Sequence, residues 1–422
     1  MSGVMRLLPE PLRHRHFRRY LAGGFSGLLG MWMLRIASAW LAWDLTGSSA
    51  FVGLVAFLNF APTVVSGPLF GVLADRADPR LGLMATQTAQ ALAAATLAKL
   101  TLGEELTPAL LCAVALFSGF AASAYHPLRM SLAPRLVPAE ILPKAVAMTA
   151  LNFNATRTVG PAAGGWLIAT QGPGTATILA ALLFAPQVHV LTTLPPQPPA
   201  PREGEGGGFR RFAAALGDGA RHGRASPATL VGFLLSGLFA LVGRGVLELL
   251  PAAADGLFGR GAAGLGALTA AAGGGAILAA LALGRLSGGT EAMQARARLA
   301  AWAGLGLTAA LAATPVWGPA LVAVAGLGAC GTVVGVSTQS IAQLGTPDGA
   351  RGRVMSLWIT VGIGGAAAGA LLLGALGDLI GLRAALLLGA AGSLVALHRR
   401  RGAGPAAAAG AEAEAPPPAH GG

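Results

Sequence analysis

The sequence carries little charge for its length. Only 11% of its 422 residues are Asp, Glu, Lys or Arg, whereas a soluble globule usually contains about a quarter. Hydrophobic residues make up 54% of the chain, and the mean hydropathy is +0.65. One soluble core cannot withdraw that much apolar surface from water. The composition therefore excludes an ordinary soluble domain and indicates an all-α polytopic membrane protein.

Lysine and cysteine are almost absent. Lys99 and Lys144 are the only lysines, so the net charge of +12 comes from arginine. Nucleic-acid binders cluster their cations on one face beside aromatic residues, whereas these arginines are scattered over alternating segments. We therefore expect no nucleic-acid partner. Cys112 and Cys330 lie in apolar runs, which predicts two buried thiols and not a disulfide framework.

Signatures of enzymatic chemistry are missing as well. No apolar run pairs His, Asp or Glu at a metal-binding or acid–base spacing, and no Ser-containing elbow precedes a helix. The Gly-x-x-x-x-Gly runs lack the Lys-Ser/Thr ending of a phosphate-binding loop. We therefore predict that the chain is not an enzyme, binds no cofactor or metal, and does not use ATP.

What the chain has instead is a series of apolar runs. Runs of about 20 residues are long enough to cross a bilayer. They predict twelve spans, near residues 20–43, 51–74, 81–101, 107–126, 143–169, 174–194, 227–250, 261–284, 297–313, 316–340, 353–376 and 380–398. A basic N-terminal segment (1–19) precedes them, a linker rich in Pro and Gly (195–226) divides them into bundles at 20–194 and 227–398, and a low-complexity tail (399–422), predicted to be disordered, follows.

The distribution of arginine predicts the orientation. With twelve spans both termini lie on one side, and that side holds most of the Lys and Arg residues. Because Lys and Arg favour cytoplasmic loops, we predict a multi-pass protein of the cell (inner) membrane with both termini in the cytoplasm. The first span then serves as an uncleaved signal-anchor.

The two halves are related to each other. Arg35 and Arg244 are separated by the same interval as Pro138 and Pro347, and several glycine pairs share that interval. A single interval that serves both ends of each half predicts two pseudo-symmetric six-helix bundles.

The loop between the second and third spans carries a recognisable motif. Gly71, Asp75, Arg76 and Arg80 match Gly-x-x-x-Asp-Arg-x-Gly-Arg-(Arg/Lys), although Asp78 stands where the motif has its second Gly. The chain thus resembles the major facilitator superfamily of transporters. The resemblance implies that this loop is a cytoplasmic gate, with Asp75 meeting the start of the eleventh helix near residues 352–355.

The fifth span contains a second motif, formed by Gly160, Pro161, Gly164 and Gly165. It is similar to the core of the antiporter motif in drug-exporting members, which implies a pivot in an exporter. Ordinary packing of small residues is the alternative. Residues 129–165 resemble the enterobactin and drug exporter-like subgroup.

Few charged residues fall inside the spans, and such residues are usually functional. The candidates for substrate binding or ion coupling are Arg35, Asp44, Asn59, Arg157, Arg244 and Glu248. Arg244 and Glu248 are four residues apart, so they share a helix face and can pair. This pair is either structural, or Glu248 exchanges a proton while Arg244 tunes it. Arginines facing a central cavity favour an anionic or hydroxyl-rich ligand.

The predicted function is therefore secondary active transport by alternating access, with a monomer in the lipid bilayer exporting a siderophore- or drug-like small molecule in exchange for protons. Two alternatives remain at this point. One is a receptor or scaffold that keeps the transporter fold without transport, and the other is an importer of a small anionic solute.

Overall fold

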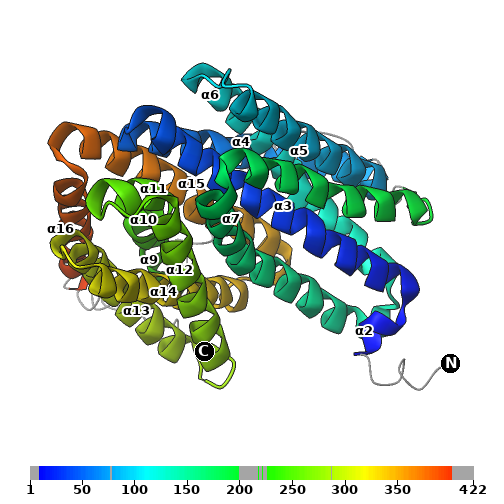
Figure 1. Cartoon of the computed structure of the whole chain (residues 1–422). Helices are drawn as coiled ribbons and strands as arrows, with labels where there is room; N and C mark the ends of the chain where they lie inside the picture. The colour runs from blue at the N-terminus through cyan, green and yellow to red at the C-terminus, as the bar shows by residue number, and fades with distance from the viewer. Residues whose placement is uncertain are drawn as a thin grey trace, which may run out of the picture.

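The computed structural model describes residues 9–76, 78–198, 217, 221, 226–286 and 288–401, excluding the side chains at 67–69, 71–76, 227, 348–353 and 400–401. In these residues every regular element is helical (Figure 1). The elements are α2 (Glu10–Arg13), α3 (Arg15–Thr46), α4 (Ser49–Arg76), α5 (Pro79–Leu102), α6 (Pro108–Leu132), η1 (Ala133–Leu136), η2 (Ala139–Ile141), α7 (Leu142–Thr193), α9 (Pro227–Phe239), η3 (Ala240–Arg244), α10 (Gly245–Glu248), α11 (Leu250–Ala252), η4 (Ala253–Leu257), α12 (Gly261–Leu283), α13 (Thr290–Ala313), α14 (Trp317–Leu344), α15 (Asp348–Ile380) and α16 (Leu382–Arg401). Most of the predicted linker and tail lies outside the described residues.

The helices are consistent with twelve spans. Among the described residues, nine helices are long and apolar enough to cross a membrane. One of them, α7, holds two spans. Two further helices, α5 and α13, have 24 residues each. At 1.5 Å per residue they are longer than a hydrocarbon core of about 30 Å, although they are less apolar than the other nine. Together these helices give twelve spans.

The break within α7 lies at Gly172, as the predicted spans 143–169 and 174–194 require. Gly172 has φ 84° and ψ 164°, a conformation that residues with a side chain rarely adopt, and Pro173 follows it. Proline has no backbone N–H to continue the helical ladder. The fifth and sixth spans are therefore joined by a turn of minimal length.

The seventh span ends about where it was predicted, near residue 250, since the stretch Ala228–Glu248 is long and apolar enough to cross a membrane. Helical turns nevertheless continue beyond it to Leu257, with π-helical turns at Ala240–Arg244 and Ala253–Leu257. Asp255 lowers the local hydropathy without ending the helix, because its carboxylate accepts hydrogen bonds from Trp43 Nε1 and the Gly261 N–H. A charge that is paired through tertiary contacts does not by itself end a helix.

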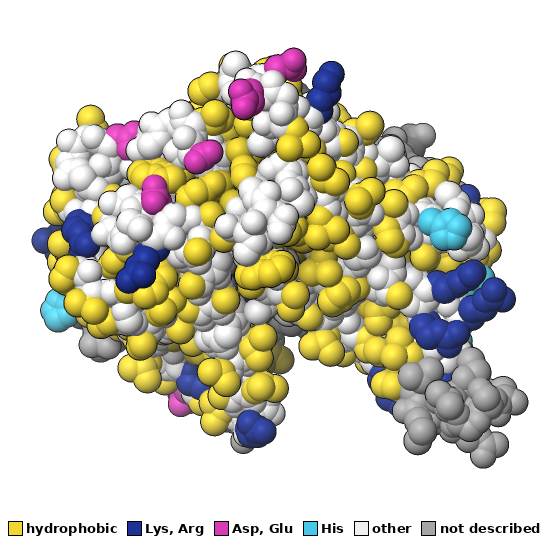
Figure 2. All heavy atoms as spheres, in the orientation of Figure 1, with side chains coloured by type: hydrophobic (Ala, Val, Ile, Leu, Met, Phe, Trp, Pro, Cys, Tyr) yellow, Lys and Arg dark blue, Asp and Glu magenta, His cyan; other side chains and the backbone are white. Residues whose placement is uncertain are grey.

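Helices α3–α7 and α9–α16 form two bundles that meet along two lines. α4 packs against α15 and α7 packs against α12. At the end of the molecule where α3 terminates, Ser49 touches Gly374 and Gly165 touches Gly266. We call this the closed end, at the upper left of Figure 1. At the opposite edge, which we call the open end, the space-filling surface is hollowed between two lobes (Figure 2).

Packing of apolar side chains joins the two bundles at the closed end. The largest cluster of buried apolar residues contains Leu34 and Val52 of the first bundle together with Val246, Leu268 and Leu373 of the second. Three smaller clusters each belong to one bundle. Burial of apolar area thus stabilises the closed end across the bundle interface. Apolar side chains spread over the outer surface in Figure 2 suit contact with lipid.

Candidate functional site

An ion pair joins the two bundles near the middle of α3. Arg35 Nη2, on α3, donates to Glu248 Oε2, on α10, at 2.6 Å. Their side chains retain 20% and 23% of their exposure, so the pair is largely removed from solvent but accessible. If Glu248 is neutralised by a proton, the charge of Arg35 is left poorly solvated and without a partner. The stability of the pair therefore depends on the protonation of Glu248.

Aromatic rings position the Arg35 guanidinium group. Its Cζ atom lies 3.6 Å from the centre of the Phe60 ring and 5.5 Å from that of Trp32. Trp32 in turn meets Phe153 edge-on at 5.8 Å between ring centres. Arginine over an aromatic face is stabilised electrostatically. α3, α4 and α7 together therefore hold Arg35 toward the second bundle.

The pairing predicted between Arg244 and Glu248 is not the one that forms. Glu248 is the last residue of the short helix α10, since Leu249 leaves helical geometry with ψ 11°. Its carboxylate meets Arg35 instead. Arg244 ends the π-helical turn η3, and its guanidinium group extends toward Gly335 of α14 and Gly362 of α15. The attraction between Arg244 and Glu248 remains, but without direct contact.

Arg157, on α7, is the third arginine of this group. Its side chain is exposed, yet it is close enough to Arg35 and Arg244 for their charges to repel one another. Neither Arg157 nor Arg244 forms an ion pair in the part of the chain that the structure describes. We call Arg35, Arg157, Arg244 and Glu248 the central charge cluster. It carries three positive charges and one negative charge.

Two further candidates lie apart from the central charge cluster. Asn59 Nδ2 donates to the Val55 carbonyl of its own helix at 3.0 Å, so this hydrogen bond is local to α4. Asp44 is exposed near the end of α3. The sequence placed both among the coupling residues, but the structure does not bring them into contact with the ion pair.

The small residues of the fifth span bring helices into close contact. A Cβ atom at Gly160 would lie 2.6 Å from Trp32 Cβ, and one at Gly164 would lie 2.6 Å from Ile36 Cγ2. A Cβ atom at Gly165 would lie 2.5 Å from Gly266 Cα. Gly160 and Gly164 therefore pack α7 against α3, while Gly165 packs it against α12 of the other bundle. Pro161 lies inside this stretch of helix.

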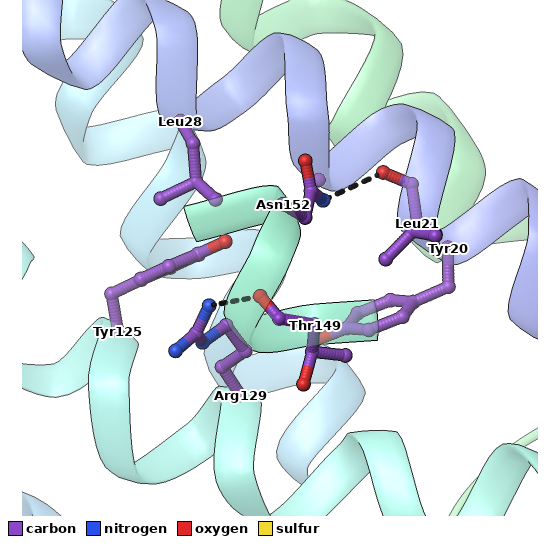
Figure 3. A pocket seen from close by; sticks show the side chains of 8 residues that line it. Tyr20, Leu21, Leu28, Tyr125, Arg129, Thr149 and Asn152 are labelled. Carbon is purple, nitrogen blue, oxygen red and sulfur yellow. Dashed lines mark hydrogen bonds between the residues drawn. The ribbon is translucent and has the colours of Figure 1, made fainter. Parts of the chain in front are cut away.

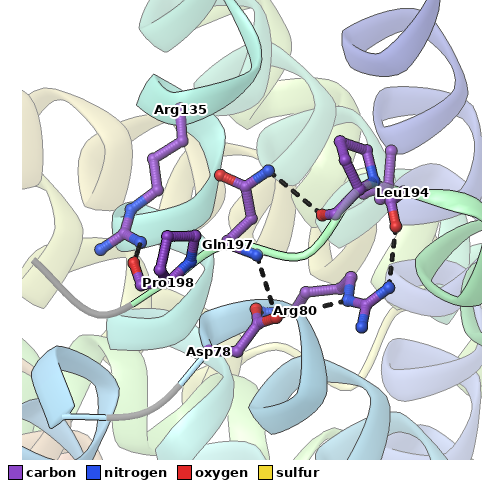
Figure 4. Close-up of polar contacts among 7 residues, drawn as sticks. Asp78, Arg80, Arg135, Leu194, Gln197 and Pro198 are labelled. Carbon is purple, nitrogen blue, oxygen red and sulfur yellow. Dashed lines mark hydrogen bonds and ion pairs between the residues drawn. The ribbon is translucent and has the colours of Figure 1, made fainter.

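The predicted gate is described only in part. At Gly71, Asp75 and Arg76 the structure describes only the helical backbone of α4, so the predicted contact of the Asp75 carboxylate lies outside what is described. Arg80 donates from Nη1 to the Leu194 carbonyl at 2.8 Å, beyond the end of α7 (Figure 4). In the described part of the chain, Arg80 thus holds the segment that directly follows the sixth span.

Asp78, the residue that departs from the motif, connects the same segments. It caps α5 by accepting a hydrogen bond from the Arg80 N–H at 2.8 Å. It also accepts one from the Gln197 N–H at 3.0 Å (Figure 4). Arg80 Nε lies 3.5 Å from Asp78 Oδ2. Sequence reasoning treated Asp78 as a substitution, whereas its position before Pro79 is typical of a helix N-cap.

Sequence reasoning also missed the polar contacts of the closed end. Asp378, on α15, accepts hydrogen bonds from the Ser49 N–H and hydroxyl at 2.8 and 2.7 Å and another from the Ser48 hydroxyl. Ser48 and Ser49 before an apolar run do indicate a helix start. Nothing local could show that the capping carboxylate comes from the other bundle.

Comparisons with known proteins agree with this architecture. The sequence profile of the transmembrane secretion effector family, a branch of the major facilitator transporters, matches residues 9–404. The enterobactin exporter EntS of Escherichia coli O127:H6 is 30% identical over 373 residues, which cover 87% of this chain and 86% of the exporter.

Solved transporters share the fold. The nucleoside transporter NupG superposes with a TM-score of 0.68 at 16% identity and covers 91% of this chain and 98% of its own. The human organic anion transporter MFSD10 superposes with a TM-score of 0.65 at 17% identity and covers 93% of this chain and 99% of its own.

Proposed function

The chain belongs to the major facilitator superfamily of membrane transporters, and on that premise we propose that it exports a hydroxyl-bearing small molecule, siderophore- or drug-like, in exchange for protons. The observation that carries this proposal is the ion pair between Arg35 and Glu248, at 2.6 Å. It joins the two bundles near the middle of α3, and both side chains keep part of their exposure. A transporter of this architecture binds its substrate at the interface between its two halves, near the middle of the membrane.

Protonation of Glu248 supplies the coupling step. The ionised carboxylate attracts Arg35 and so favours the arrangement in which α3 and α10 are close. A proton on Glu248 removes that charge and weakens the charge-assisted hydrogen bond. The two bundles then lose one of their central connections, which favours the alternating movement that transport requires.

Export and import differ in whether substrate and proton compete for Glu248 or bind together. A substrate hydroxyl that donates a hydrogen bond to the Glu248 carboxylate needs the ionised form, so substrate and proton compete for the same oxygen atoms. Competition of this kind produces exchange. An anionic solute that binds Arg35 instead displaces Glu248, which protonation helps, so solute and proton bind together. That second mode is the importer alternative, and the excess positive charge of Arg157 and Arg244 is the observation in its favour.

The orientation follows from the same proposal. We place the open end, where α3 begins, in the cytoplasm, with both termini on that side, in the cell (inner) membrane. The arrangement is then ready to receive a substrate from the cytoplasm. Asp75 of the proposed gate belongs to this side, and Gly160, Pro161, Gly164 and Gly165 form the proposed pivot. We propose that the transporter works as a monomer.

Proteoliposomes with an imposed pH gradient test the proposal. With the open end facing outward and candidate siderophores and dyes outside, an acid interior should drive uptake of the exported substrate. Glu248→Gln should abolish that dependence on the gradient, while Glu140→Gln, at an exposed carboxylate, should keep it. Substrate binding should tighten as the pH rises, because the substrate hydroxyl donates to the ionised carboxylate of Glu248.

Two outcomes would decide for the alternatives. Binding that tightens as the pH falls, with uptake driven by an acid exterior, identifies an importer of an anionic solute. Folded protein that moves no substrate in either gradient identifies a receptor or scaffold that has kept the transporter fold.

A further inference from the structure

The first turns of α3 carry arginines on one face of the helix. Arg15, Arg18 and Arg19 stand at positions i, i+3 and i+4, which place side chains on the same side of an α-helix. The opposite side turns toward the first bundle, where Phe17 and Tyr20 are 0% and 3% exposed. Arg15 is exposed, and Arg18 and Arg19 are half-buried. The three arginines therefore lie on the outer side of the bundle.

Contacts on the inner side hold α3 in this rotation about its axis. Figure 3 shows the Tyr20 ring reaching from α3 toward Thr149 and Arg129. Asn152 Nδ2, on α7, donates to the Leu21 carbonyl at 3.0 Å (Figure 3). Because the inner side is packed and hydrogen-bonded, the arginine face keeps its outward direction.

Apolar side chains continue the arginine face toward the middle of α3. Ala22 and Phe25 occupy the next positions of that face and are exposed, Phe25 by 39%. Along the length of α3, this outer face is thus basic for its first turns and apolar for the next.

The end of α7 runs beside this face and shows the same order. A Cβ atom at Gly23 would lie 3.2 Å from Val190 Cγ2, so the last turns of α7 lie against the first turns of α3. Leu182 is 62% exposed, and His189, seven residues later on the same helix face, is exposed as well. We call Arg15, Arg18, Arg19 and His189 the basic stripe.

The basic stripe has no matching negative charge among the described residues. Glu10 is the only acidic residue between positions 9 and 43, and it pairs with Lys144 at 2.6 Å. α7 contains no acidic residue. No ion pair of Arg15, Arg18 or Arg19 forms in the part of the chain that the structure describes. Figure 2 shows basic and histidine side chains gathered at the end where α3 begins, which Figure 1 places away from the second bundle.

We propose that the basic stripe binds the headgroup of one anionic phospholipid in the leaflet at the open end, with the acyl chains against Phe25 and Leu182. Arginine suits phosphate because its guanidinium group offers several donors and a permanent charge, and basic segments beside a membrane helix attract anionic lipids. A soluble acidic peptide would match the charge but not the apolar side chains that continue the same face. A phospholipid presents a negative head and apolar chains in the order that the surface requires.

The bound lipid would connect the start of α3 with the end of α7, which are the first and sixth spans of the same bundle. A ligand that binds the folded protein raises its stability with concentration. The lipid is therefore expected to stabilise the protein whatever substrate is transported. The proposal depends on the position of the chain in a bilayer and not on the proposed exchange of substrate for protons.

Thermal unfolding of the full-length protein in a non-ionic detergent tests the proposal, with phosphatidylglycerol as the probe. Phosphatidylcholine with the same acyl chains and glycerol 3-phosphate, the free headgroup, are the comparisons. The Tm should rise with phosphatidylglycerol and then saturate, while phosphatidylcholine gives a much smaller rise and glycerol 3-phosphate gives none. Native mass spectrometry should show one tightly retained phosphatidylglycerol.

Variants of the basic stripe locate the lipid. Arg15→Gln with Arg19→Gln should raise the phosphatidylglycerol concentration at half-saturation by about thirtyfold, and Arg15→Gln alone, at an exposed residue, by about fivefold. Arg15→Lys with Arg19→Lys keeps both charges and should keep most of the affinity. Arg285→Gln with Arg298→Gln removes the same charge at two exposed arginines of the second bundle and should leave the response intact.

Four results would each overturn the proposal. The first is a Tm that responds equally to phosphatidylglycerol and phosphatidylcholine. The second is an equal response to glycerol 3-phosphate, which would identify a site for free phosphate. The third is an unchanged half-saturation in Arg15→Gln, and the fourth is an equal loss in the second-bundle control, which would show a general attraction between charges and not a site.

Discussion

Asp378, near the end of α15, caps the start of α4 in the other bundle by accepting hydrogen bonds from the N–H and hydroxyl groups of Ser49. A carboxylate at a helix N-terminus satisfies unpaired N–H groups and interacts favourably with the helix dipole. Here the cap also connects the two bundles. Its loss should therefore weaken the closed end without disturbing either bundle internally.

Replacing Asp378 with Ala should shift the transporter toward the state in which the closed end is open. The loss of these exposed hydrogen bonds should remove about 1 kcal/mol, roughly a fivefold change in the ratio of the two states. Spin labels at Leu45 and Leu379, with both cysteines replaced by serine, report the separation. Glu105→Gln, at an exposed carboxylate outside this contact, serves as the control, and equal label distances in all three proteins would contradict the prediction.

Gly165→Ala should push α7 and α12 apart. The added Cβ atom would lie 2.5 Å from Gly266 Cα, where only backbone can move, and overpacking of this kind destabilises by about 1–3 kcal/mol. We expect a lower Tm and slower transport. Gly274→Ala, also in a helix but with nothing within 4 Å of its added Cβ atom, should leave both unchanged or raise the Tm slightly.

Arg157→Gln should weaken the binding of substrates that carry an acidic oxygen. Because Arg157 has no ion-pair partner in the described part of the chain, its replacement leaves no orphaned carboxylate there. The KM of transport should rise by about tenfold, the size expected for one hydrogen bond to a charged group. Arg157→Lys keeps the charge and should recover part of the affinity, so equal losses in both variants would argue against an electrostatic role.

Asp75 and Asp78 should separate gating from folding. Asp75→Asn is expected to slow transport while leaving expression and Tm intact, as a gate residue should. Asp78→Ala removes the cap of α5 and the hydrogen bond from Gln197, so it should lower stability by about 1 kcal/mol. Transport assays and thermal unfolding of both variants make the comparison, and wild-type rates in Asp75→Asn would exclude the gate.

Local patterns in the sequence were enough to predict the membrane class, the twelve spans, and the division between the fifth and sixth spans. Gly172 and Pro173 interrupt an apolar run, and both act on their own backbone. The same locality explains why the helical turns beyond the seventh span were not predicted, because Asp255 is retained in them by a hydrogen bond from Trp43, 212 residues away.

The sequence by itself determined that this chain is a bundle of membrane helices with arginines inside it, because hydropathy and charge act over a few neighbouring residues. Only the tertiary structure decided which groups meet. Glu248 binds Arg35 across 213 residues in place of its helical neighbour Arg244, and Asp378 caps a helix that begins 329 residues earlier. These partners meet because of how the two bundles pack. The spacing of residues along the chain does not show which of them will be close in space.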